Sequence, residues 1–163
     1  MFPSVISPPL DSIDKKTQYA EINQALQAVL TGESDRIANL ANAAALLFWS
    51  LLAVNWAGFY LLKEQGLVLG PFQGKIACVR IKLGQGVCGT AAEQRQTLVV
   101  PNVHEFSGHI ACDSASNSEI VVPIIKNDAL IGVLDIDSPE FTRFDDNDKT
   151  GLQEFVQILS AAL

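Results

Sequence analysis

The residues best suited to chemistry in this chain are its three cysteines, Cys78, Cys88 and Cys112, which all fall within one 35-residue stretch of the 163 residues. A cysteine thiolate is both a nucleophile and a metal ligand. The odd number of thiols and the lack of a Cys-x-x-Cys pair argue against a disulfide-stabilised scaffold and against a zinc ribbon. Two interpretations remain, which are reversible thiol chemistry and three ordinary buried cysteines.

Each cysteine has a different sequence environment. Cys112 lies in a segment of small and polar residues, 109–119, where several backbone N–H groups can converge on an anion, either a thiolate or a substrate carboxylate. Cys88 comes near the start of a predicted short helix, where the helix dipole would favour its thiolate, although a small buried residue fits the same position. Cys78 has only Arg80 as a local activating group.

The spacing of possible metal ligands does not predict a metal site. No pair among the cysteines and the two histidines, His104 and His109, has the short spacing typical of zinc sites. We therefore expect no metal and no other cofactor, and a positioning or solvent-exposed role for the histidines. A structural zinc domain remains an alternative, which stoichiometric metal in the purified protein would support.

Three acidic residues form a second candidate cluster. Asp135 and Asp137 are two positions apart at the end of a predicted buried strand, so both side chains point to one face. Glu119 starts the partner strand of a predicted hairpin. A two-residue turn would pair it with Ile136, whereas a three-residue turn can place it opposite Asp137. Three carboxylates there could hold an ammonium group, and crowding would raise the pKa of one of them to give a general acid. Strand-end aspartates that make turn hydrogen bonds are the alternative.

Two aromatic residues share a face of another predicted strand. Trp56 and Tyr60 are four positions apart, so both point the same way. They form either part of the core, which periodicity favours, or the apolar wall of a pocket for a small ligand.

The elements that would position these residues occur in an order typical of an α+β domain: helices, then a mostly antiparallel sheet, then a covering helix. Residues 1–13 are predicted to be an N-terminal arm and residues 14–163 a single domain. Residues 101–118 form a long polar loop, and loops of that length are usually functional. The predicted helices cover residues 14–30, 34–51 (capped by Ser34), 86–94 and a final segment capped by Asp145, and the predicted strands cover residues 55–62, 67–72, 97–100, 120–125 and 129–136.

Composition excludes several classes of protein. Hydrophobic residues make up 48% of the chain, which predicts a well-filled core. The net charge of −7 and the lack of a basic run argue against nucleic-acid binding. The N-terminus does not resemble a secretory signal, so we expect a cytoplasmic protein. Residues 37–62 carry no charge, but the apolar period changes within them, which predicts a helix that leads into a buried strand rather than a membrane span.

Four motifs together give the sequence a recognisable pattern. They are GPFQGKIAC at residues 70–78, GQGVCGTAA at 84–92, HIACDSASNSEIVVP at 109–123 and LIGVLDIDSP at 130–139. In this order, and with all three cysteines included, they resemble the free methionine-(R)-sulfoxide reductases, which are built on a GAF domain. A GAF domain of another kind would share only the last motif.

The resemblance implies a six-stranded antiparallel sheet flanked by helices, and commonly a homodimer. By motif, Cys112 corresponds to the catalytic nucleophile, Cys78 to the main resolving cysteine and Cys88 to a third thiol that can also pair with Cys112. The acidic pocket of the family corresponds to Glu119, Asp135 and Asp137, and its aromatic wall to Trp56 and Tyr60.

The expected activity is reduction of free methionine-R-sulfoxide through a cysteine sulfenic acid and an intramolecular disulfide, with thioredoxin as the reductant. The acid would be Glu119 or Asp137. A GAF module that binds a small amino-acid-like ligand and senses redox state without turnover is the alternative function.

Overall fold

A computed structural model describes residues 14–64, 66–108 and 114–163 of the chain. Cys112, His109 and the arm predicted for residues 1–13 lie outside the described residues, so their predictions are not tested by it.

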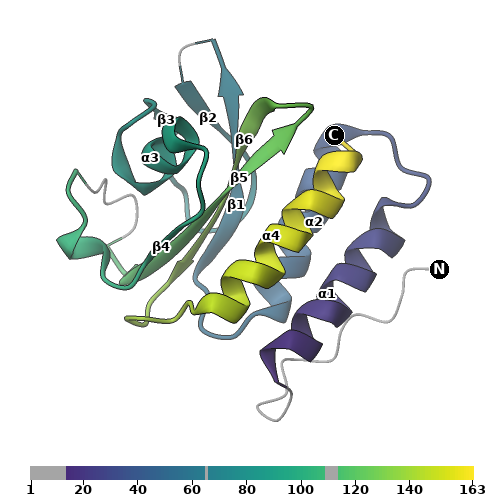
Figure 1. Ribbon diagram of the computed structural model, residues 1–163, viewed down its shortest axis with the longest axis horizontal. Coiled ribbons are helices and arrows are strands. Elements are labelled where there is room, and N and C mark those ends of the chain that lie inside the picture. Colours follow the sequence, from purple (N-terminus) through teal and green to yellow (C-terminus); the bar gives the residue numbers. More distant parts are fainter. Residues whose placement is uncertain (1–13, 65, 109–113) are drawn as a thin grey trace.

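One antiparallel sheet organises the described residues (Figure 1). Its six strands lie in the order β3-β2-β1-β6-β5-β4, and every neighbouring pair is antiparallel. The predicted α+β class is therefore confirmed. The strands are β1 (Trp56–Lys63), β2 (Gly66–Gly74), β3 (Arg80–Ile81), β4 (Leu98–Val100), β5 (Ser118–Lys126) and β6 (Ala129–Ser138).

Helices cover both faces of this sheet (Figure 1). One face carries α1 (Lys15–Leu30), α2 (Arg36–Ser50) and α4 (Asp146–Ala161), and α1 packs on α4. The other face carries the short helix α3 (Gly86–Gln94). A single 3-10 turn, η1 (Val103–Glu105), lies in the long polar segment that follows β4.

Side chains that alternate along the central strands separate two cores. Phe59, Leu134 and Ile136 point toward the layer of α1, α2 and α4 and belong to the larger core. Trp56, Tyr60 and their neighbours point the other way, into a smaller core beneath α3. Because the pleat reverses the side of the sheet at every residue, the chemically capable residues share the α3 face.

The N-cap of α2 differs from the prediction. Its cap is Asp35 rather than Ser34, and the Asp35 carboxylate accepts a hydrogen bond from the Ala38 backbone N–H at 2.8 Å. Both residue types are good caps, so the sequence alone placed the boundary one residue early. The prediction that Asp145 caps the final helix is confirmed by hydrogen bonds from the backbone N–H groups of Asn147 and Asp148.

The uncharged stretch at residues 37–62 divides as predicted into a helix, α2, and a buried strand, β1. Among the described residues, no helix is long and apolar enough to cross a membrane.

The register of the β5–β6 hairpin combines the two alternatives left open by the sequence. The turn has two residues, Asn127 and Asp128, both with positive φ, and it pairs Lys126 with Ala129. A bulge then adds one residue to β6, since Ile125 pairs with Leu130 but Ile124 pairs with Gly132. This single insertion shifts every later pair by one position. Glu119 consequently lies opposite Asp137 rather than Ile136.

Candidate active site

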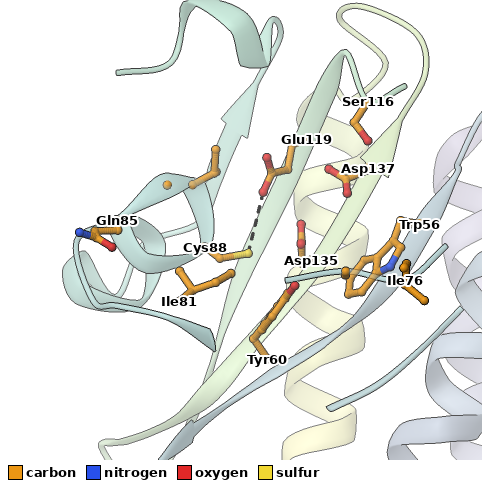
Figure 2. A pocket seen from close by; sticks show the side chains of 13 residues that line it. Trp56, Tyr60, Ile76, Ile81, Gln85, Cys88, Ser116, Glu119, Asp135 and Asp137 are labelled. Atoms are coloured by element: carbon orange, nitrogen blue, oxygen red, sulfur yellow. Dashed lines mark hydrogen bonds between the residues drawn. The ribbon is translucent and has the colours of Figure 1, made fainter. Parts of the chain in front are cut away.

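A pocket opens on the α3 face of the sheet, where β1, β5 and β6 lie side by side (Figure 2). The sheet forms its floor, α3 forms one wall, and residues 76 and 77 of the segment between β2 and β3 form another. Six of the residues singled out from the sequence line it, namely Trp56, Tyr60, Cys88, Glu119, Asp135 and Asp137.

Three carboxylates dominate the chemistry of this pocket. Glu119 and Asp137 are directly paired across β5 and β6, and Asp135 lies two residues before Asp137 on the same face. Glu119 and Asp135 are buried, and Asp137 is half-buried. None of the described lining residues is a lysine or arginine. Burial, followed by the neighbouring charges of Asp135 and Asp137, raises the pKa of Glu119 well above its usual range.

Asp135 has one carboxylate oxygen that lacks a partner. It is only 6% exposed, and within the described part of the chain its Oδ1 atom has no hydrogen-bond partner. Burial raises the pKa of its carboxyl group to about 6. A buried carboxylate oxygen without a partner is unfavourable, so this position suits a cationic group that arrives with a ligand.

Cys88 lies at the third position of α3 and faces the carboxylates. Its Sγ atom lies 3.9 Å from Oε1 of Glu119, in a geometry in which the thiol donates to the carboxylate (Figure 2). Burial, with the charges of Asp135 and Glu119, raises the pKa of this thiol well above its usual range. The expectation that the helix dipole favours a thiolate here is therefore wrong, because burial and negative neighbours outweigh the dipole.

The aromatic residues serve the core and the pocket together. The Trp56 ring stacks on Phe72 at 5.2 Å and on Tyr60 at 5.9 Å between ring centroids. Both Trp56 and Tyr60 are almost fully buried, yet both line the pocket. Gly58, between them on β1, leaves room for this stack, since a Cβ atom there would lie 2.8 Å from the Trp56 ring. Trp56 and Tyr60 thus belong to the smaller core and also line the pocket.

The polar atoms of these rings hold the segment that carries Cys78. The Trp56 indole N–H donates to the backbone carbonyl of Lys75 at 3.1 Å, and the Tyr60 hydroxyl donates to the carbonyl of Cys78 at 3.0 Å. The floor of the pocket is thereby tied to the backbone on both sides of Ile76 and Ala77.

Comparison of the chain with known proteins identifies its family. The family model described as "GAF domain" matches residues 35–163. Free methionine-R-sulfoxide reductase of Escherichia coli is 54% identical over 151 residues, which are 93% of this chain and 92% of that protein. The chain belongs to the free methionine-R-sulfoxide reductase family of GAF domains. The resemblance carried by the four motifs is thus confirmed.

Solved structures of this family agree with the fold. The fRMsr of Staphylococcus aureus in complex with substrate matches with a TM-score of 0.85 and 52% identity, covering 89% of this chain and 95% of that chain. The free methionine-R-sulfoxide reductase of Neisseria meningitidis in complex with its substrate matches with a TM-score of 0.90 and 42% identity, covering 96% and 94%.

Cys78 lies differently from Cys88. Cys78 is half-buried beside the pocket and is disulfide-bonded, whereas Cys88 is a free, buried thiol. Cys112 lies outside the described residues.

Sequence reasoning missed some residues of the pocket. Ser116 lines it and accepts a hydrogen bond from the Asn55 side-chain amide at 3.1 Å, and Gln85 lines it as the N-cap of α3. Ile76 also lines it, although its side chain is 91% exposed. Both Gln85 and Ile76 lie inside the quoted motifs, which was the available signal. Ser116 likewise lies inside the motif quoted at residues 109–123.

The pocket can therefore bind a small molecule that combines a cation with an apolar group. The carboxylates supply the negative charge, and Trp56 with Tyr60 supplies an apolar surface. The raised pKa of Glu119 keeps its carboxyl group protonated to a higher pH than usual, which suits it to donate a proton.

Proposed function

We propose that this protein reduces free methionine-R-sulfoxide to methionine. The observation that carries the proposal is the buried carboxylate pocket beside an aromatic wall, with Asp135 left without a partner for Oδ1 among the described residues. Its membership of the free methionine-R-sulfoxide reductase family supports the same substrate.

The pocket explains why the free amino acid would be preferred. The ammonium group of methionine sulfoxide would pair with Glu119, Asp135 and Asp137, and its methyl-sulfur end would contact Trp56 and Tyr60. Backbone N–H groups of residues 113–118 would receive its carboxylate. A methionine within a peptide has neither charge, so it would leave the buried carboxylates unpaired and should be rejected.

The first chemical step uses Cys112 and an acid. The Cys112 thiolate attacks the sulfoxide sulfur, and a proton from Glu119 or Asp137 goes to the oxygen. The bond between the substrate sulfur and its oxygen then breaks as the oxygen forms a new bond to the Cys112 sulfur, and the bond between the two sulfurs breaks. Methionine leaves, and Cys112 is left as a sulfenic acid. The substrate sulfur is reduced by two electrons, and the Cys112 sulfur is oxidised by two. The raised pKa of Glu119 supports its role as the donor.

The second step restores the enzyme. The Cys78 thiol attacks the sulfenic sulfur of Cys112, which forms a disulfide and releases water. Thioredoxin then reduces this disulfide by thiol exchange and is itself oxidised to a disulfide. The disulfide-bonded state of Cys78 supports a resolving role. Cys88 is the second possible partner of Cys112, although its buried position beside Glu119 makes its thiol a poor nucleophile.

The test is turnover of separated R and S forms of free methionine sulfoxide with thioredoxin, thioredoxin reductase and NADPH. We expect reduction of the R form alone, with N-acetylmethionine-R-sulfoxide as the unreactive control. Cys112→Ser should abolish activity, whereas Cys78→Ser should retain a single turnover. Full activity of Cys112→Ser would overturn the mechanism. Ligand binding without any turnover of the unmodified protein would favour a sensor module instead.

We also propose, from the family resemblance alone, that the protein is a cytoplasmic homodimer. Light scattering coupled to size-exclusion chromatography would measure the mass, and a value near the monomer mass of 17.6 kDa would contradict the dimer.

A further inference from the structure

Beyond the proposed sulfoxide chemistry, three side chains in the pocket have the composition of a metal site. Cys88 of α3, Glu119 of β5 and Asp135 of β6 each offer one ligand atom, and these atoms all lie within 4.8 Å of one another. All three side chains are buried. Their separation in the sequence explains why spacing alone predicted no metal.

The charge around these atoms is not balanced by the protein. Asp135 lines the pocket and is only 6% exposed. Its Oδ1 atom has no hydrogen-bond partner within the described part of the chain. Lysine and arginine are absent from the described lining residues. An unpartnered carboxylate oxygen beside a second carboxylate and a thiol is a site prepared for a cation.

The donor set selects the kind of cation. Ca²⁺ and Mg²⁺ take oxygen ligands and avoid thiolates, whereas Zn²⁺ accepts sulfur and carboxylate oxygen together. Tetrahedral Zn²⁺ with ordinary bond lengths places its sulfur and oxygen ligands about 3.5 Å apart. The Cys88 Sγ to Glu119 Oε1 distance of 3.9 Å needs a contraction of only a few tenths of an ångström.

We propose that Cys88, Glu119 and Asp135 bind a zinc ion, and that this ion excludes the substrate from the pocket. Zinc binding rests on the three ligands and on the unpartnered Asp135 oxygen, and does not depend on the proposed function. Exclusion of substrate rests on the proposed function, because Glu119 and Asp135 are the residues assigned there to the substrate ammonium group. Zinc would thus inhibit the enzyme by occupying the cation subsite, without contact with Cys78.

Cobalt titration of a protein with a single thiol tests the site directly. In a Cys78→Ser/Cys112→Ser double variant, Cys88 is the only cysteine. We expect one equivalent of Co²⁺ to bind and to give the near-ultraviolet absorption of a cobalt–thiolate bond, and one equivalent of Zn²⁺ to remove it. No such absorption in the folded double variant would overturn the proposal.

Further variants distinguish a three-ligand site from nonspecific binding of Co²⁺ to the Cys88 thiol. Adding Glu119→Gln or Asp135→Asn to the double variant should weaken Co²⁺ binding by at least about tenfold, while the exposed control Asp146→Asn should leave it unchanged. Equal affinity in all of these variants would contradict the three-ligand site. If the double variant does not fold, reduced unmodified protein and Cys88→Ser are compared, and the proposal requires that Cys88→Ser bind one equivalent fewer.

Competition with methionine tests the second half of the proposal. Adding L-methionine to the cobalt-loaded double variant should displace the metal, whereas L-alanine, which chelates Co²⁺ in solution in the same way but lacks the methylthioether side chain, should not. Displacement by neither compound would overturn the shared subsite. The metal titration is independent of turnover, so absence of sulfoxide reductase activity would count against the proposed function and leave the titration decisive for the metal.

Discussion

At the residue scale, Asp135 shows a conflict between stability and binding. Its carboxyl group is buried on β6 without a cation among the described lining residues, and burial raises its pKa to about 6 from the ordinary 3.8. The folded protein therefore holds this proton more tightly than the unfolded chain does. The resulting stability is fully present below pH 3.8 and is lost as the pH rises through about 6.

Asp135→Asn should consequently stabilise the protein near pH 7 while it weakens methionine binding. A shift of about two pKa units corresponds to a gain of about 2 to 3 kcal/mol, which should shrink as the pH falls toward 4. Urea unfolding at several pH values measures it, with the exposed Asp146→Asn as the control. A variant that is less stable than the unmodified protein at pH 7.5 would show that Asp135 contributes to the fold rather than opposing it.

Tyr60 offers a second prediction at this scale, because its hydroxyl donates to the carbonyl of Cys78 at 3.0 Å. Tyr60→Phe keeps the apolar ring but releases this part of the Cys78 segment. We expect the variant still to release methionine in the first turnover, while its disulfide forms about tenfold more slowly. A tenfold change in rate corresponds to the loss of one hydrogen bond of about 1.4 kcal/mol.

Trapping of the sulfenic acid with dimedone after rapid mixing measures the Tyr60→Phe effect. The change should make no further difference in a Cys78→Ser background, where resolution is already absent. An equal slowing of the first methionine release in both backgrounds would assign Tyr60 to substrate binding alone.

At the element scale, the sequence predicted most strands and helices but not how they meet. Apolar periodicity placed α1, α2, α4 and the central strands to within a few residues, since each is long and strongly patterned. β3 has only two residues, Arg80–Ile81, which is too short for any period to appear. The position of Glu119 opposite Asp137 depends on a bulge of one residue beside Gly132. A β-branched run gives no sign of such a bulge.

For the candidate site, too, the sequence predicts what lies within one strand but not how separate elements meet. Trp56, Tyr60, Asp135 and Asp137 are predicted to share faces because the pleat period of two fixes side-chain direction within a strand. The meeting of Cys88 with the carboxylates could not be predicted, because it depends on how α3 packs on β5 and β6. Tertiary packing also raises the pKa of the Cys88 thiol, whereas the helix dipole was expected to lower it.

The packing of α1 on α4 depends on one buried charge. Asp148 is fully buried, and its carboxylate accepts hydrogen bonds from the Tyr19 hydroxyl at 2.9 Å and from the Arg143 guanidinium at 3.1 Å. Lys15 completes the ion pairs from the first turn of α1. Asp148→Asn would leave both cations without their anion, so we expect a loss of about 3 kcal/mol in the free energy of unfolding. Guanidinium denaturation of this variant and of Asp146→Asn measures the difference, and similar midpoints would refute it.

At the scale of the whole molecule, the pocket and the fold are energetically linked. The buried carboxylates oppose folding as long as they lack a cation, and a bound ammonium group would remove part of that penalty. A ligand that binds only the folded protein stabilises it by mass action, by about 2.7 kcal/mol at a hundred times its Kd.

L-Methionine, the proposed product, should therefore raise the Tm by several degrees at pH 7.5, given about 2 to 4 °C per kcal/mol for a domain of this size. N-acetylmethionine should not, since it lacks the ammonium group that pairs with Glu119 and Asp135. The shift should become smaller below pH 6, where protonation of Asp135 removes the charge that the ligand needs. Differential scanning fluorimetry across a pH series measures all three effects. Equal shifts with the two compounds would mean that the apolar wall of Trp56 and Tyr60, and not the carboxylates, determines which ligand the fold accepts.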